Sequence, residues 1–196
     1  MTNNDILRRI RYTFNFRDPE VGSIFAMADC QVTREQVGNW LRKSEDPAFL
    51  ELSDTELATF LNGLIIDRRG KREGPKPAPE AVLNNNIILR KLRIALDLKA
   101  EDILEILSFS SFCISKHELS ALFRKPGNKH YRECKDQILR NFLNGMTAKY
   151  RVNAKSQPDK EPSTDESQPG KEPSTDESQP DKELSADESC PDTEQE

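Results

Sequence analysis

Apolar residues recur along the chain at spacings of three and four, which is the spacing of one face of an α-helix. The first such stripe consists of Ile6, Leu7, Ile10 and Phe14. A second stripe of the same kind consists of Ile88, Leu89, Leu92 and Leu96. The alternation of apolar and polar residues that is typical of strands is not sustained anywhere. The pattern therefore predicts an all-α protein.

The helical pattern occurs twice in the sequence. Residues 3–69 align without a gap with residues 85–151, and 17 of the 67 pairs are identical. In each copy we expect four helices. The first begins at an asparagine N-cap, Asn3 or Asn4 in one copy and Asn85 or Asn86 in the other, and the second begins near Asp18-Pro19 or its counterpart. The third begins with a capping box, Thr33-x-x-Gln36 or Ser115-x-x-Glu118, and the fourth carries Leu57 to Leu64 or Leu139 to Met146.

This repetition predicts two units and a connection. We expect helical repeat units at residues 1–69 and 83–152, joined by a basic, exposed Gly/Pro linker at residues 70–82. A unit of this size is marginal alone, because it buries only about 60% of the surface that its unfolded chain exposes. We therefore expect the two units to pack together.

The last part of the chain has a different composition. Only 4 of residues 153–196 are apolar, against 64 of residues 1–152, and an 11-residue repeat begins at Gln157. Such a segment has too little apolar surface to offset the entropy of ordering, so we predict a disordered acidic tail at residues 153–196. The tail either keeps the protein in solution or folds back on the basic part and competes with an anionic ligand.

The charges are divided in the same way. Residues 153–196 carry 4 Lys and 14 Asp plus Glu, a net charge of −10, which leaves +5 on residues 1–152 from the whole-chain −5. No apolar run approaches the roughly 18 residues of a membrane span, and the first residues lack the apolar run of a signal peptide. We therefore expect a cytoplasmic protein with no membrane partner.

Several basic side chains recur at equivalent positions of the two copies, and they are the candidate ligand-binding groups. The stripe on the two first helices consists of Arg8 and Arg11 with their counterparts Arg90 and Arg93. We expect these arginines to form a two-fold related anion site, because a guanidinium suits phosphate oxygens. The rim of that site would be Arg42, Lys43, Arg124 and Lys125, and a cationic arm in the linker would be Arg68, Arg69, Lys71 and Arg72. The alternative is that the arginines are structural and cover apolar surface with their stems.

An Asn-Gly pair recurs in the middle of each predicted fourth helix. The pairs are Asn62-Gly63 and Asn144-Gly145, and we place them at the seam between the two units. Glycine and asparagine each weaken a helix interior by up to about 1 kcal/mol relative to alanine. Either the glycines allow close helix approach, or the amides are presented at the seam.

No catalytic motif, cofactor motif or metal-binding spacing is found, so the sequence predicts a non-enzymatic protein without a cofactor or a metal. The two histidines, His117 and His130, both lie in the second copy. Cys30, Cys113 and Cys134 are interpreted as buried thiols. An enzyme with a pocket at the seam remains the less favoured alternative.

Several segments carry a resemblance to a known family. They are NNDILRRIRY with its counterpart NNIILRKLRI, VGNWLRK, FLNGLIIDRRGK and YRECKDQILRNFLNG. Over residues 1 to about 152 the chain resembles the YehS family of uncharacterised bacterial proteins. The resemblance implies a cytosolic protein of duplicated domains and no catalytic residues to transfer. The acidic tail departs from the compact form that the family implies.

These observations favour a non-catalytic binding module for RNA or DNA. The second and third helices of each copy also suit a helix-turn-helix, although this pattern has low specificity. The alternative is a protein-interaction adaptor or a homo-oligomer whose arginines are structural.

Overall fold

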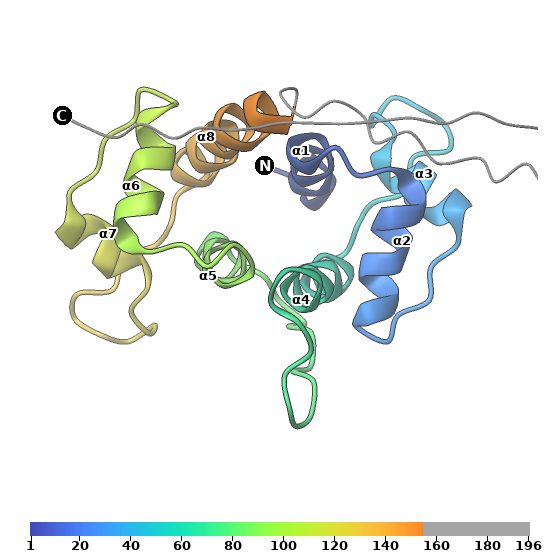
Figure 1. Cartoon of the computed structure of the whole chain (residues 1–196), viewed down its shortest axis with the longest axis horizontal. Coiled ribbons are helices and arrows are strands. Elements are labelled where there is room, and N and C mark those ends of the chain that lie inside the picture. Colours follow the sequence, from blue (N-terminus) through green and yellow to red (C-terminus); the bar gives the residue numbers. More distant parts are fainter. Residues whose placement is uncertain (155–196) are drawn as a thin grey trace, which may run out of the picture. The chain divides into compact units, whose positions relative to one another are not determined.

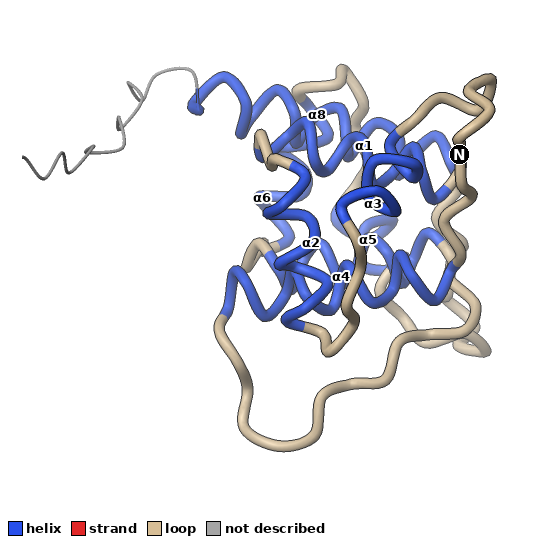
Figure 2. The backbone as a smooth tube through the Cα atoms, turned by 90° about the vertical axis from the view of Figure 1, so that its right-hand side faces the viewer, coloured by secondary structure: helices blue, strands red, loops and turns tan. Residues whose placement is uncertain are grey.

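The computed structural model describes residues 1–154 of the chain, and the side chains of residues 1–151. This part contains eight α-helices and no strand, as Figures 1 and 2 show. The helices of the first repeat are α1 (Asn3–Phe14), α2 (Asp18–Met27), α3 (Arg34–Leu41) and α4 (Asp54–Arg69). Those of the second repeat are α5 (Asn85–Ala95), α6 (Ala100–Ser108), α7 (Lys116–Leu122) and α8 (Asp136–Ala154). The predicted all-α fold of two four-helix repeats is confirmed.

Side-chain caps fix where the third helices begin. The Thr33 side chain accepts from the Gln36 N–H while the Gln36 side chain accepts from the Thr33 N–H, and Ser115 and Glu118 form the same pair. Each pair satisfies amides that the first turn of a helix leaves without an intrahelical partner. The two capping boxes that the sequence predicts are therefore confirmed.

The first helices begin one or two residues earlier than predicted. Thr2 is the N-cap of α1 and Asn84 is the N-cap of α5. Asn4 lies inside the first turn and is buried, as is its counterpart Asn86. The prediction of asparagine caps at residues 3 or 4 and 85 or 86 was wrong, because the amides of Asn4 and Asn86 bond one carbonyl at the end of the third helix and one in the loop that follows it instead.

The first helix of each repeat packs mainly against the fourth helix of the other repeat. α1 lies along α8, and α5 lies along α4, whereas α1 touches α4 and α5 touches α8 much less. Figure 1 shows these four helices in the centre, with α2 and α3 on one side and α6 and α7 on the other. The two repeats therefore share one interior through two equivalent contacts, which we call the α1/α8 seam and the α4/α5 seam.

One continuous set of buried residues runs through both repeats. In the first repeat, the Phe25 ring lies 5.2 Å from the Trp40 ring and 5.4 Å from the Phe60 ring, measured between centroids. The second repeat buries Leu107, Leu122 and Phe142 at the equivalent positions. α8 extends two residues into the segment that was predicted to be disordered. The rest of that prediction, residues 155–196, lies outside the described residues.

Candidate functional site

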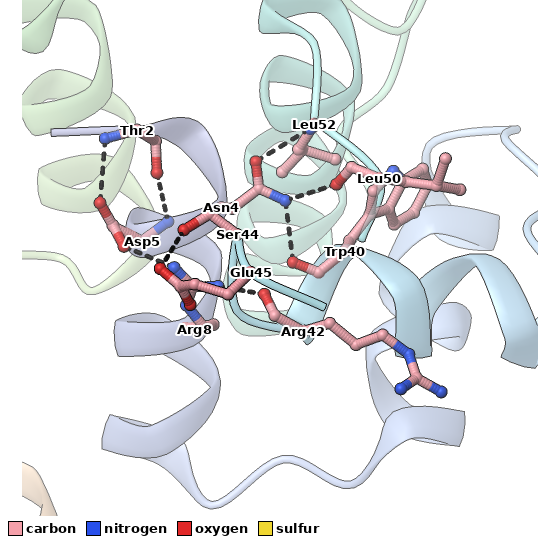
Figure 3. A network of polar contacts seen from close by, with 10 residues as sticks. All are labelled: Thr2, Asn4, Asp5, Arg8, Trp40, Arg42, Ser44, Glu45, Leu50 and Leu52. Atoms are coloured by element: carbon pink, nitrogen blue, oxygen red, sulfur yellow. Dashed lines mark hydrogen bonds and ion pairs between the residues drawn. The ribbon is translucent and has the colours of Figure 1, made fainter. Parts of the chain in front are cut away.

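The arginines in the middle of the first helices bond to the end of the third helix. Arg8 donates to the Arg42 carbonyl and forms a 2.6 Å ion pair with Asp5. Its counterpart Arg90 donates to the Phe123 carbonyl over 3.0 Å. Figure 3 shows Arg8 between Asp5 and the Arg42 carbonyl, with the Arg42 guanidinium pointing away. Both arginines therefore satisfy carbonyls that a helix end leaves without a partner.

The second pair of arginines at equivalent positions of the two repeats, Arg11 and Arg93, also has partners in the fold. Arg11 forms a 2.9 Å ion pair with Asp18 at the start of α2. Arg93 donates to the Leu98 carbonyl over 3.1 Å, and its guanidinium lies 4.8 Å from the centroid of the Phe123 ring. These contacts hold the first helix to the elements that follow it in the same repeat.

The four arginines do not lie in one site. Arg8 lines a hollow of about 580 Å³ on the α1/α8 seam. Arg90 and Arg93 line a different hollow of about 450 Å³, together with Arg69. The prediction of a single anion site formed by all four was therefore wrong, because the reciprocal packing of the repeats separates the two first helices.

The residues predicted to form the rim differ between the repeats in their ion pairs and in their exposure. Arg42 forms a 2.8 Å ion pair with Asp46, and Lys43 beside it is exposed. In the second repeat, Lys125 is exposed and Arg124 is half-buried. Neither Arg124 nor Lys125 forms an ion pair with a carboxylate of the described chain.

The predicted cationic arm is only partly a linker. Arg68 and Arg69 form the last turn of α4, and Gly70 ends that helix. The Arg68 guanidinium lies 4.7 Å from the centroid of the Phe14 ring, and Arg69 forms a 2.7 Å ion pair with Asp97. Lys71 and Arg72 are exposed in the linker.

A buried cation marks the α4/α5 seam. Lys91 Nζ lies 2.5 Å from Asn62 Oδ1 and 2.8 Å from Glu80 Oε2, and Lys91 is 7% exposed. Asn62 Nδ2 also donates to the Pro77 carbonyl over 3.2 Å. The linker thus returns to the seam and supplies it with a carbonyl and a carboxylate.

The α1/α8 seam has the same pair of groups without a covering segment in the described chain. Arg9 stands at the position of Lys91 and donates to Asn144 Oδ1, which stands at the position of Asn62. Asn144 is exposed, whereas Asn62 is 5% exposed. Arg9 and Lys91 differ between the two copies, so a comparison of identical residues does not find them, although the retained positive charge at this position is a signal in the sequence.

The glycines next to these asparagines do not lie at the seams. A Cβ atom on Gly63 would come within 1.9 Å of the Ile24 carbonyl oxygen, and one on Gly145 within 1.8 Å of the Ile106 carbonyl oxygen. Each glycine therefore allows the fourth helix to approach the second helix of its own repeat. The placement of Asn62 and Asn144 at the seams agrees with the structure, and that of Gly63 and Gly145 does not.

A second basic surface lies on the loop that joins α7 and α8. We call residues 124–135 the basic loop, and its cations are Arg124, Lys125, Lys129, Arg132 and Lys135. With Glu133 as the single acid, its net charge is 5 − 1 = +4. The equivalent residues 42–53 carry Arg42 and Lys43 against Glu45, Asp46 and Glu51, so their net charge is 2 − 3 = −1. Lys129, Arg132 and Lys135 have no basic counterpart in the first copy, so a comparison of charges that both copies retain does not find them.

The basic loop surrounds a hollow of about 430 Å³ with residues of α7. The ring of Tyr131 contributes to its wall, and its hydroxyl donates to Asn86 Oδ1 over 3.2 Å. His117 and His130 line the same hollow and are exposed. In Figure 1 the basic loop projects from the lower side of the second repeat.

The described cysteines do not all behave as predicted. Cys134 is buried, and burial together with the neighbouring charge of Asp136 raises the pKa of its thiol to about 12. Cys30 is half-buried, but Cys113 is exposed because it lies in the loop between α6 and α7. No group of three His, Cys, Asp or Glu side chains in the described part of the chain is arranged to hold a metal ion. Among the helices of residues 1–154, none combines the length and the apolar character that crossing a membrane requires.

Comparison with known proteins agrees with this duplicated helical architecture. The family described as "Protein of unknown function (DUF1456)" matches the chain twice, at residues 3–70 and 85–151. The chain belongs to this family. It is also 45% identical over 153 residues to "Uncharacterized protein YehS" of Escherichia coli (strain K12), which covers 78% of this chain and 98% of that protein. No solved structure matches the chain. The resemblance to the YehS family that the sequence motifs indicate is thereby confirmed.

Proposed function

We propose that the chain is a non-catalytic binding module that binds RNA or DNA through the basic loop. The observation that carries this proposal is that the five cations of the loop form no ion pair within residues 1–154, whereas Arg8, Arg11 and Arg42 of the first repeat are each paired with an aspartate. Unpaired cations on an exposed loop are available to phosphate groups, and their binding releases counterions.

The surroundings of the loop suit a nucleic acid as well. Tyr131 offers part of an aromatic ring beside the cations, and such a ring can stack on an unpaired base. The linker, which lies on the lower side of the molecule in Figure 1, adds exposed positive charge through Lys71 and Arg72. The arginines of the first helices, by contrast, are held by carbonyls and carboxylates, so we assign them a structural role.

A pair of equivalent lysines gives a matched test. We expect Lys125→Ala in the basic loop to weaken the binding of a fluorescein-labelled single-stranded RNA, and to lower the slope of log K against log salt by about 0.7, because one phosphate contact is lost. Lys43→Ala changes the equivalent exposed lysine of the first repeat and should leave the slope unchanged. Fluorescence anisotropy at several salt concentrations, repeated with a DNA duplex, measures both.

Two results would refute the proposal. One is the absence of binding to either nucleic acid at low salt. The other is an equal loss of affinity in Lys125→Ala and Lys43→Ala. In that case a protein-interaction surface becomes the better candidate. Its support would be that Met27 and Phe109, at equivalent positions of the two repeats, are 37% and 52% exposed.

A further inference from the structure

The linker at the α4/α5 seam shows how an extended segment binds to a seam of this protein. Residues 75–80 have the sequence Pro-Lys-Pro-Ala-Pro-Glu and no regular secondary structure. The Pro77 carbonyl accepts from Asn62 over 3.2 Å, and the Glu80 carboxylate lies 2.8 Å from the Lys91 ammonium. The side chains of Asn62 and Lys91 are also bonded to each other. This seam therefore holds a backbone carbonyl and, three residues later, a carboxylate.

The α1/α8 seam has the same two polar groups, and the hollow beside them is open to solvent. Arg9 stands at the position of Lys91 and donates to Asn144, which stands at the position of Asn62. Both Arg9 and Asn144 line the hollow of about 580 Å³. Within residues 1–151, no carboxylate forms an ion pair with Arg9. In the described fold, Arg9 thus has no counterpart of the carboxylate that Lys91 binds.

The donors of the open seam suit a segment of the same kind. A guanidinium carries five N–H donors in a planar fork, so Arg9 can bond Asn144 and a carboxylate at the same time. The Asn144 oxygen accepts from Arg9, and its amide nitrogen can donate to a backbone carbonyl, as that of Asn62 does. The acidic side chain of the hollow, Asp5, forms its 2.6 Å ion pair with Arg8. A carboxylate for Arg9 therefore has to come from another segment.

An aromatic ring at the open seam suits a proline residue of such a segment. At the covered seam, Ile94 lines one hollow together with Pro75 and Pro77. Tyr12 stands at the position of Ile94, lines the open hollow and is 54% exposed. The Arg151 guanidinium lies over the Tyr12 ring, 3.5 Å from its centroid. Extended proline-containing segments bind beside exposed aromatic rings at a low entropic cost, because their conformation is largely fixed before binding.

We propose that the α1/α8 seam is a docking site for an extended, proline-containing acidic peptide of a partner protein. In this arrangement a glutamate of the peptide pairs with Arg9, and the carbonyl three residues before it accepts from Asn144. A proline of the peptide contacts the Tyr12 ring. The α1/α8 seam thus binds from another protein what the α4/α5 seam binds from its own chain. The proposal goes beyond nucleic-acid binding and does not rest on it, because the basic loop surrounds a separate hollow.

The probe for this site is a synthetic peptide with the sequence of residues 74–83, added to the full chain. It carries the carbonyl and the carboxylate at the spacing that the covered seam binds. The chain's own linker competes for the α4/α5 seam at a roughly millimolar effective concentration, so the α1/α8 seam is the free site. Nuclear magnetic resonance of the isotope-labelled chain follows the side-chain amides of Asn144 and Asn62 during the titration.

We expect the Asn144 signal to shift until it saturates while the Asn62 signal stays in place. A peptide with Glu80→Gln should bind about tenfold more weakly, because a hydrogen bond to a charged group is lost. The Arg9→Gln chain should bind both peptides equally weakly. Arg9→Lys introduces the cation of the covered seam and should keep the preference for glutamate.

The matched control is Arg34→Gln, which removes an exposed arginine that does not line the hollow. It should leave the affinity for both peptides unchanged. The proposal would be overturned by equal affinities of the two peptides for the unchanged chain, by equal losses in Arg34→Gln and Arg9→Gln, or by a shift of Asn62 in place of Asn144. An Asn144 signal that does not respond to the peptide would also overturn it, and a response to single-stranded RNA instead would show a nucleic-acid surface.

Discussion

The two buried asparagines of the first helices show how much of this fold depends on single polar side chains. Asn4 donates to the carbonyls of Trp40 and Leu50, both over 2.8 Å, and accepts from the Leu52 N–H over 3.0 Å. Asn86 makes the equivalent three bonds in the second repeat. Each asparagine thus satisfies one carbonyl at the end of the third helix and two backbone groups of the loop before the fourth helix. Because this loop has no regular structure, no other group of the fold supplies these bonds.

Replacing this asparagine should therefore be costly. We expect Asn4→Ala to lower the free energy of unfolding by about 3 kcal/mol or more, because it leaves buried backbone groups unsatisfied. Asn4→Asp should also destabilise the protein, because a carboxylate cannot donate to the two carbonyls. Urea unfolding followed by circular dichroism measures both.

The control for this experiment is Asn39→Ala. Asn39 is half-buried on α3, and its side-chain oxygen accepts from Arg42, which is exposed. Its removal should change the free energy of unfolding by no more than about 0.5 kcal/mol. If the two alanine variants were equally stable, Asn4 would not have the structural role that its hydrogen bonds indicate.

The second and fourth helices of each repeat approach each other closely. Gly63 of α4 faces the backbone of Ile24 on α2, and Gly145 of α8 faces that of Ile106 on α6. A rigid backbone cannot move aside as a flexible side chain can, so the space for a Cβ atom is absent. Glycine has a lower helix propensity than alanine at this position, but it allows α2 and α4 to lie in close contact.

Glycine-to-alanine substitutions in α4 and in α3 should consequently change the free energy of unfolding in opposite directions. Gly63→Ala should lower the free energy of unfolding by about 1–3 kcal/mol, because overpacking outweighs the better helix propensity of alanine. Gly38→Ala on α3 should raise it by about 0.5–1 kcal/mol, since a Cβ atom there meets no atom within 4 Å. Thermal and urea unfolding of both variants test this. A stabilising Gly63→Ala would contradict the close approach of α2 and α4.

The sequence allows prediction of the elements better than prediction of how they pair. Helix positions and the capping boxes at Thr33 and Ser115 depend on neighbouring residues only, so they can be predicted from the sequence. The sequence does not show which fourth helix packs against α1, because α4 and α8 are copies of one helix and present similar apolar faces. For the same reason the sequence cannot show whether a retained arginine binds a phosphate or a helix-end carbonyl, since the guanidinium suits both.

The reciprocal packing of first and fourth helices makes the two repeats interdependent at the scale of the whole described fold. α1 of the first repeat needs α8 of the second, and α5 of the second needs α4 of the first. Unfolding of either repeat would expose the apolar face of a helix in the other. We therefore expect residues 1–154 to unfold in one cooperative transition rather than in two.

The single tryptophan of the chain, Trp40, allows this cooperativity to be tested from a distance. Ile103→Ala removes a fully buried side chain from α6 in the second repeat and should cost about 2–5 kcal/mol. Because the repeats share one interior, the urea midpoint reported by Trp40 fluorescence in the first repeat should fall as far as the midpoint reported by circular dichroism. Val21→Ala, at the equivalent position of the first repeat, should lower both midpoints in the same way. Independent repeats would instead leave the Trp40 midpoint of Ile103→Ala unchanged and split the circular dichroism transition in two, which would contradict a fold held together by exchanged first helices.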